Sequence, residues 1–161
     1  VTSGSAGTGA GTVWFTVAPN PLSATRAGTI GVGGQLFTVT QSGVACSFTG
    51  EPTATVGPGA GLRNSPITAT AEDCAWTTTT QTPWLHINSA PSAAGTGTFA
   101  YTYEANGSSV ARVGTILAAG LTHTVTQQGV PCSWTLSQTS ATAPASGTSV
   151  PIAVSATSSV P

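Results

Sequence analysis

One feature limits what this chain can fold into: a long segment of the sequence occurs twice. Residues 11–49 align without a gap with residues 97–135, and about half of the aligned positions are identical. The copies lie 86 residues apart, as Arg26 and Arg112 show, so a structural unit of 86 residues is predicted to recur. The prediction divides the chain into residues 1–44 (the C-terminal half of one repeat), 45–130 (a complete repeat) and 131–161 (the N-terminal strands of the next).

Short segments with alternating apolar and polar residues are separated by turn residues throughout the chain. Such alternation is typical of β-strands with one buried face, and Gly33-Gly34 predicts a tight hairpin because glycine accepts positive φ. We therefore predict an all-β fold of tandem immunoglobulin-like β-sandwich modules. The predicted strands are residues 12–17, 26–32, 36–41, 46–49, 53–56, 66–71, 75–79, 84–88, 98–103, 112–117 and 122–127, with a turn at residues 90–92.

The repeat alignment also predicts which side chains face inward. Alternation places one set on a single side in each copy, and these sets should form the two cores. The predicted inward residues are Val13, Phe15, Val17, Ile30 and Val39 in the first copy and Phe99, Tyr101, Tyr103, Ile116 and Val125 in the second. In the last part of the chain, Ile152 is expected to correspond to Ile67.

The charge of the chain argues against several kinds of partner. Lys and Arg together number 3, all of them Arg, and the formal net charge is −1. Nucleic-acid binding needs clustered cations, so no nucleic-acid partner is expected. No apolar run approaches the roughly 20 residues that span a bilayer, so no membrane insertion is expected. Because the sequence begins at Val1 and has no Met, we expect a processed product or an excerpt of a longer protein.

Several small motifs occur in an order that resembles one known family, the BACON domain (Bacteroidetes-associated carbohydrate-binding often N-terminal). The resemblance spans residues 45–130 and the matching parts of both flanks. It is carried by Cys46-x-Phe48, Cys74-Ala75-Trp76, Trp84-Leu85-x-Ile87, Gly95-x-Gly97, Tyr101-x-Tyr103, Asn106, Arg112-x-Gly114-Thr115-Ile116 and Val125-x-Gln127-x-Gly129. The resemblance implies an immunoglobulin-like sandwich in secreted or surface proteins, commonly in tandem, and suggests carbohydrate binding.

The cysteines fit such a setting. Cys46 and Cys74 both lie in the complete repeat, next to strands expected to face each other, and we predict a disulfide between them. The third copy has Ser158, Ser159 and Val160 near the position of Cys74. Cys132 is therefore expected to be free or to pair beyond Pro161, and the chain is expected to be extracellular or at the cell surface.

No set of residues in the sequence indicates a catalytic or metal-binding site. The acids are Glu51, Glu72, Asp73 and Glu104, and the pair Glu72-Asp73 is interpreted as a solvated turn rather than a calcium or catalytic site. His86 and His123 have no Cys or His at ligand spacing, and His123 is expected to cap the edge of the core. Asn106-Gly107-Ser108 is interpreted as a turn rather than a glycosylation site. We predict no enzyme activity, no metal and no cofactor.

Aromatic side chains are the candidates for binding. Trp76 follows Cys74 as a core tryptophan would. Trp84 starts a strand in which Leu85 and Ile87 share the other face, so partial exposure is expected. Trp14 points away from its neighbours on the inward face, and its counterpart is Ala100, so the fold does not require it. The possible ligand or chain contacts are Trp14, Trp84 and Trp134.

Two functions are compatible with this sequence. The first is a non-catalytic extracellular structural module, namely a stalk, a spacer or a filament-forming subunit built from tandem repeats. Its partners would be neighbouring copies of the repeat, joined head to tail within one chain or between chains. The alternative is a carbohydrate-binding module that contacts glycans through its tryptophans.

Overall fold

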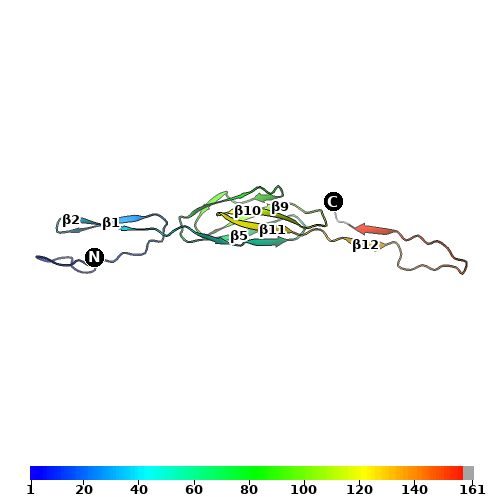
Figure 1. The fold of residues 1–161 in the computed structure, drawn as a ribbon, viewed down its shortest axis with the longest axis horizontal. Coiled ribbons are helices and arrows are strands. Elements are labelled where there is room, and N and C mark those ends of the chain that lie inside the picture. Colours follow the sequence, from blue (N-terminus) through cyan, green and yellow to red (C-terminus); the bar gives the residue numbers. More distant parts are fainter. Residues whose placement is uncertain (158–161) are drawn as a thin grey trace.

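The computed structural model describes residues 1–157, and their regular secondary structure is all β. Three parts follow one another along the long axis of the molecule (Figure 1): residues 1–44 at one end, residues 45–130 in the middle, and residues 131–157 at the other end. Over the described residues, no helix is long and apolar enough to cross a membrane. The predicted all-β class is confirmed.

The central part consists of two β-sheets. One has five strands and the other four, and both contribute side chains to a common core, so the sheets pack face to face. In spatial order, the first contains β4 (Thr53–Val56), β11 (Leu121–Gln127), β10 (Arg112–Ala118), β6 (Ala75–Thr80) and β8 (Ser92–Ala94). The second contains β3 (Phe48–Gly50), β5 (Gly61–Ala69), β9 (Gly97–Tyr103) and β7 (Leu85–Ile87).

The core of this sandwich lies where the sequence predicted it. Phe99, Tyr101, Ile116 and Val125 are at most 1% exposed, and Tyr103 packs against them from the margin. Strand β8 was missed, since residues 90–92 were expected to form a turn. It is a short edge strand of Ser and Ala with every side chain exposed, so no apolar alternation marks it.

The N-terminal part contains a hairpin of β1 (Arg26–Val32) and β2 (Gln35–Gln41), as predicted. Its pairing repeats that of β10 and β11: Arg26 lies opposite Gln41 as Arg112 lies opposite Gln127. The turn is also the same, because Gly33-Gly34 and Ala119-Gly120 all have positive φ. The local sequence therefore determines the hairpin in both copies.

The strand predicted at residues 12–17 does not form. Its only pairing among the described residues is an isolated bridge between Ser3 and Trp14. The counterpart in the central part is β9, which hydrogen-bonds to β5 on one side and to β7 on the other. Residues 12–17 have no neighbour in the place of β5, and in the place of β7 only Thr2 and Ser3 bond to Trp14, so the hydrogen-bond ladder is too short to form a strand.

The C-terminal part contains a second hairpin, of β12 (Ser133–Leu136) and β13 (Val154–Thr157). It corresponds to the pair β3–β5, with Leu136 in the place of Gly50. Val154 lies opposite Leu136, and Ile67 lies opposite Gly50. The counterpart of Ile67 is thus Val154, and the expectation for Ile152 is wrong by two residues. The connecting loop is one residue longer than in the central part. Because Ile152 and Val154 are two residues apart in an extended segment, their side chains lie on the same face.

Candidate functional site

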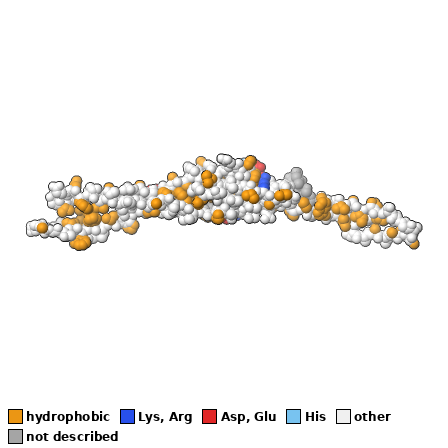
Figure 2. All heavy atoms as spheres, viewed as in Figure 1, with side chains coloured by type: hydrophobic (Ala, Val, Ile, Leu, Met, Phe, Trp, Pro, Cys, Tyr) orange, Lys and Arg blue, Asp and Glu red, His pale blue; other side chains and the backbone are white. Residues whose placement is uncertain are grey.

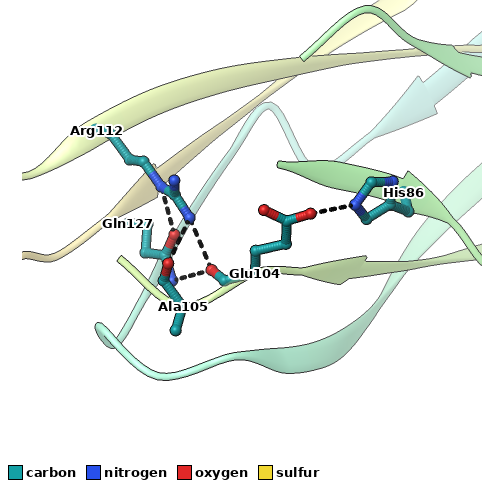
Figure 3. A network of polar contacts seen from close by, with 5 residues as sticks. All are labelled: His86, Glu104, Ala105, Arg112 and Gln127. Atoms are coloured by element: carbon teal, nitrogen blue, oxygen red, sulfur yellow. Dashed lines mark hydrogen bonds and ion pairs between the residues drawn. The ribbon is translucent and has the colours of Figure 1, made fainter. Parts of the chain in front are cut away.

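A network of polar contacts fastens one end of the central sandwich (Figure 3). The guanidinium of Arg112 donates from Nε to Oε1 of Gln127 at 2.9 Å and from Nη2 to the carbonyl oxygens of Glu104 and Ala105 at 2.8 and 3.1 Å. The same guanidinium lies 4.3 Å from the ring centroid of Trp84, in cation–π contact. The Gln127 side chain is fully buried and donates to the carbonyl oxygen of Glu104 at 2.9 Å. We call this network the arginine clasp.

The hydrogen bonds that Arg112 donates in the arginine clasp recur in the N-terminal part. Arg26 donates from Nε to Oε1 of Gln41 at 2.9 Å and from Nη2 to the carbonyl oxygens of Ala18 and Pro19. Asn20 also repeats Asn106: each side-chain amide donates to a carbonyl oxygen four residues later in the loop and to the carbonyl oxygen of the residue that follows the second strand of the hairpin. Asn106 is only 4% exposed, and its Oδ1 accepts a hydrogen bond from the Ser108 amide at 3.2 Å, as in an Asx turn, which agrees with the turn interpreted from the sequence. These residues are structural in both copies.

The N-terminal part differs in leaving its predicted core uncovered. Ile30, Val39 and Val13 are half-buried, while Phe15 and Val17 are 36% and 47% exposed, so the expectation that these five residues form a core is wrong. Instead, Phe15, Val17, Ile30 and Val39 line an open groove of about 320 Å³. The rings of Phe15 and Phe37 lie 6.0 Å apart and repeat the Tyr101–His123 pair of the central part, at 5.6 Å.

A second apolar surface lies at the opposite end of the molecule. Figure 2 shows hydrophobic side chains gathered over the β1–β2 end and over the β12 end. On the β12–β13 hairpin and the segment leading into it, the most exposed large apolar side chains are Trp134, Leu136, Ile152 and Val154, each between 53% and 68% exposed. We call the groove of the N-terminal part, together with Phe37 and Val32 on the same side of the β1–β2 hairpin, the acceptor face, and we call this second surface the donor face.

The structure separates the predicted tryptophans into two groups. Trp14 and Trp134 are 66% and 68% exposed and remain available for contact. Trp76 is buried and donates from its indole nitrogen to the carbonyl oxygen of Gly95, as a core residue. Trp84 is 9% exposed, so the prediction of a partly exposed contact residue is wrong. Trp84 precedes β7 in a turn, where the alternation used for the prediction does not apply, and its ring packs under Arg112.

Most acids and both histidines are engaged in structural contacts. His123 is a core residue rather than a cap: it is 2% exposed, and its Nδ1 lies 2.6 Å from the Glu51 carbonyl oxygen and its Nε2 lies 3.2 Å from the Tyr101 hydroxyl. Burial raises the pKa of Tyr101 to about 12. His86 lies 3.0 Å from the Glu104 carboxylate on the surface. Within residues 1–157, no group of three or more His, Cys, Asp or Glu side chains is arranged to hold a metal ion.

Sequence reasoning missed a polar cluster around Glu51. Its carboxylate accepts hydrogen bonds from Arg63 at 2.7 Å and from the hydroxyl of Ser65, which is fully buried, at 3.1 Å. The backbone carbonyl oxygen of Glu51 lies within hydrogen-bond distance of Nδ1 of His123, as described above. The cluster joins β5, β11 and the segment between β3 and β4. No sequence spacing pointed to it, because these residues meet only when the two sheets pack.

Sequence reasoning also missed a bond between two parts of the chain. Asp73, expected in a solvated turn, accepts hydrogen bonds from the Ser23 amide at 2.7 Å and from the Ser23 hydroxyl at 2.8 Å. The backbone hydrogen bond from Ser23, and then that from its hydroxyl, lower the pKa of Asp73 below its ordinary value of 3.8. Ser23 belongs to the N-terminal part and Asp73 to the central part, so this contact joins the two.

The predicted disulfide is present. Cys46 and Cys74 are bonded, with their Cα atoms 5.5 Å apart, and the bond connects the start of the central part to the turn before β6. Cys132, which aligns with Cys46, is a free and exposed thiol. Both observations agree with the expectations from the sequence.

Comparisons with known proteins identify no family. No family model and no curated protein matches the chain. Among solved structures, the chain is similar to a GH5 xyloglucanase of Bacteroides ovatus in complex with a XXXG heptasaccharide, with a TM-score of 0.45 and 17% sequence identity. The match covers 53% of this chain and 20% of the enzyme chain, so this chain spans about a fifth of that protein. A similarity at this level carries no argument about function.

Proposed function

We propose that the chain is a non-catalytic structural module of an extracellular or cell-surface protein, a stalk, spacer or filament-forming subunit built from tandem immunoglobulin-like repeats. The observation that carries the proposal is the recurrence of one unit along an extended axis. The β1–β2 hairpin repeats the β10–β11 hairpin in pairing, turn and the hydrogen bonds donated by the arginine. The Ser23–Asp73 contact joins the first unit to the next.

Further observations support the individual terms of the proposal. The two packed sheets of the central part, with Trp76 buried in the core, are compatible with an immunoglobulin-like sandwich of the BACON kind. The Cys46–Cys74 disulfide fits an oxidising compartment and so an extracellular setting. Glu51, Asp73 and Glu104 are all engaged in contacts with neighbouring residues, which suits a scaffold better than acid–base chemistry.

The proposal is tested by the shape of the chain in solution. Small-angle X-ray scattering of the 161-residue chain, extrapolated to zero concentration, should give an elongated particle whose longest dimension matches that of Figure 1. A spacer must hold its length, so the same dimension is expected over a wide range of temperature below unfolding. A scattering curve typical of a compact particle or of a flexible chain would contradict the structural role.

A carbohydrate-binding module is the second candidate, and the exposure of Trp14 and Trp134 is the observation that favours it. Exposed indole rings are suitable platforms for stacking on sugar rings. Glycan-array screening of the chain should give binding that disappears in Trp14→Ala or Trp134→Ala if this candidate holds. Trp84→Ala is unsuitable for this test because Trp84 is buried. Failure to bind any glycan would leave the structural module as the better function.

A further inference from the structure

The central part shows what normally covers the face that the N-terminal part leaves open. His123 and Ala118 are at most 2% exposed because the sheet of β3, β5, β9 and β7 packs over β10 and β11. Their counterparts on the hairpin β1–β2 are Phe37 and Val32, which are 55% and 43% exposed. The acceptor face is therefore equivalent to one sheet of a sandwich, and the sheet of β3, β5, β9 and β7 in the central part shows what the second sheet looks like.

The donor face resembles that other half. Trp134 takes the place of Phe48, which packs against the central core, and Val154 takes the place of Ile67, which is 2% exposed in it. On the hairpin β12–β13 these positions are exposed. Two complementary faces thus occur on one molecule.

Each end also contains a segment that lacks only a partner to become a strand. Residues 12–17 correspond to β9, which in the central part pairs with β5. Residues 139–142 correspond to β4, which pairs in parallel with β11, and they form no strand in the part of the chain that the structure describes. The donor face can supply the β5-like strand, and the acceptor face can supply the β11-like strand.

We propose that the acceptor face binds the donor face of a second copy of this chain. The pairing of strands in the central part predicts the contacts. If β13 extends toward its N-terminal side, Ile152 lies opposite Val13, as Ser65 lies opposite Phe99. Thr139 pairs with Thr38, as Thr53 pairs with Thr124. The two faces lie at opposite ends of an extended molecule, so one chain cannot satisfy both by folding back (Figure 1). Such a contact does not close on itself, and it adds copies head to tail.

The proposal rests on the structural function proposed above and names its partner. The joint between copies is expected to be weaker than the central sandwich. Residues 75–86, which carry the whole of β6 together with the core residues Trp76 and Trp84, have no counterpart in either terminal part. Assembly should therefore depend on concentration and reverse on dilution.

The test is sedimentation velocity of the 161-residue chain over a wide concentration range, in a Cys132→Ser background that prevents cross-linking through the exposed thiol. Phe37→Asp damages the acceptor face and Trp134→Asp damages the donor face. Leu36→Asp and Thr135→Asp are the matched controls, because both residues are exposed and lie on the opposite side of the same strands. The urea unfolding midpoint of the central part, measured where the chain is monomeric, should be the same in all variants because none of the four positions lies within residues 45–130.

The parent chain and both controls should form dimers and longer species as concentration rises, and each face variant should stay monomeric. A mixture of the Phe37→Asp and Trp134→Asp chains should stop at dimers, because one intact donor meets one intact acceptor. A monomeric parent chain, assembly in both face variants, or a mixture that stays monomeric would overturn the proposal. An elongated monomer would leave the structural function standing, whereas a compact or flexible particle at infinite dilution would remove that function independently.

Discussion

The two hairpins of the repeat have the same local structure and opposite surroundings. Ile116 and Val125 of the central part are fully buried. Ile30 and Val39 are the same residue types at the aligned positions, but they are only half-buried on the acceptor face. The hydrogen bonds donated by the arginine, the hairpin register and the turn are the same in both. The comparison shows that the hairpin and these hydrogen bonds depend on local sequence, while burial depends on a second sheet that only the central part possesses.

The largest difference between the two parts is expected when the same isoleucine is truncated in each. Ile116→Ala should lower the free energy of unfolding of the central part toward the upper end of the roughly 2–5 kcal/mol range, because Ile116 is fully buried and a cavity remains. Ile30→Ala should leave that transition within about 0.5 kcal/mol of the parent. Urea unfolding of both variants, measured at a concentration where the chain is monomeric, makes the comparison. Equal losses would show that the acceptor face is already covered in the monomer.

The aligned cysteines provide the next comparison. Cys46 and Cys74 close a loop with a sequence separation of 28, and restricting the unfolded chain in this way stabilises by about 3.6 kcal/mol in the entropy model. Cys46→Ser should lose that amount in a urea melt, whereas Cys132→Ser should change nothing because its thiol is free. Non-reducing peptide mapping should recover Cys132 unmodified by disulfide. A stable Cys46→Ser chain would indicate that packing alone holds the turn before β6.

The same distinction between local and long-range structure explains which sequence predictions succeeded. The β1–β2 and β10–β11 hairpins and the buried face of β10 follow from alternation, which is a property of short segments. The disulfide follows from the placement of two cysteines in one repeat, next to strands expected to face each other. Residues 12–17 have the right alternation but no neighbouring strands, so no strand forms there. Trp84 lies in a turn, beyond the reach of an alternation argument. The Ser23–Asp73 contact joins residues 50 apart, and no pattern in the sequence brings them together.

The smallest effect is expected for the Ser23–Asp73 contact, which joins the N-terminal part to the central part. The pKa of Asp73 is lowered because the Ser23 amide and hydroxyl stabilise the carboxylate. A lowered pKa means that the contact favours the joined state above the ordinary value of 3.8, and that this contribution is lost as pH falls through the lowered pKa. The joint should therefore be intact at neutral pH and should loosen only in strong acid.

Nuclear magnetic resonance can follow this loss directly through the Ser23 amide proton, which donates to the Asp73 carboxylate at 2.7 Å. Its chemical shift should change on acidification with a midpoint below 3.8, and Asp73→Asn should abolish that titration. Ser23→Ala is the matched control, because it removes the hydroxyl but keeps the amide, so its midpoint should lie between that of the parent chain and 3.8. A parent midpoint at or above 3.8 would mean that the two parts are not held together here in solution, and the similar hairpins would then belong to units that move independently.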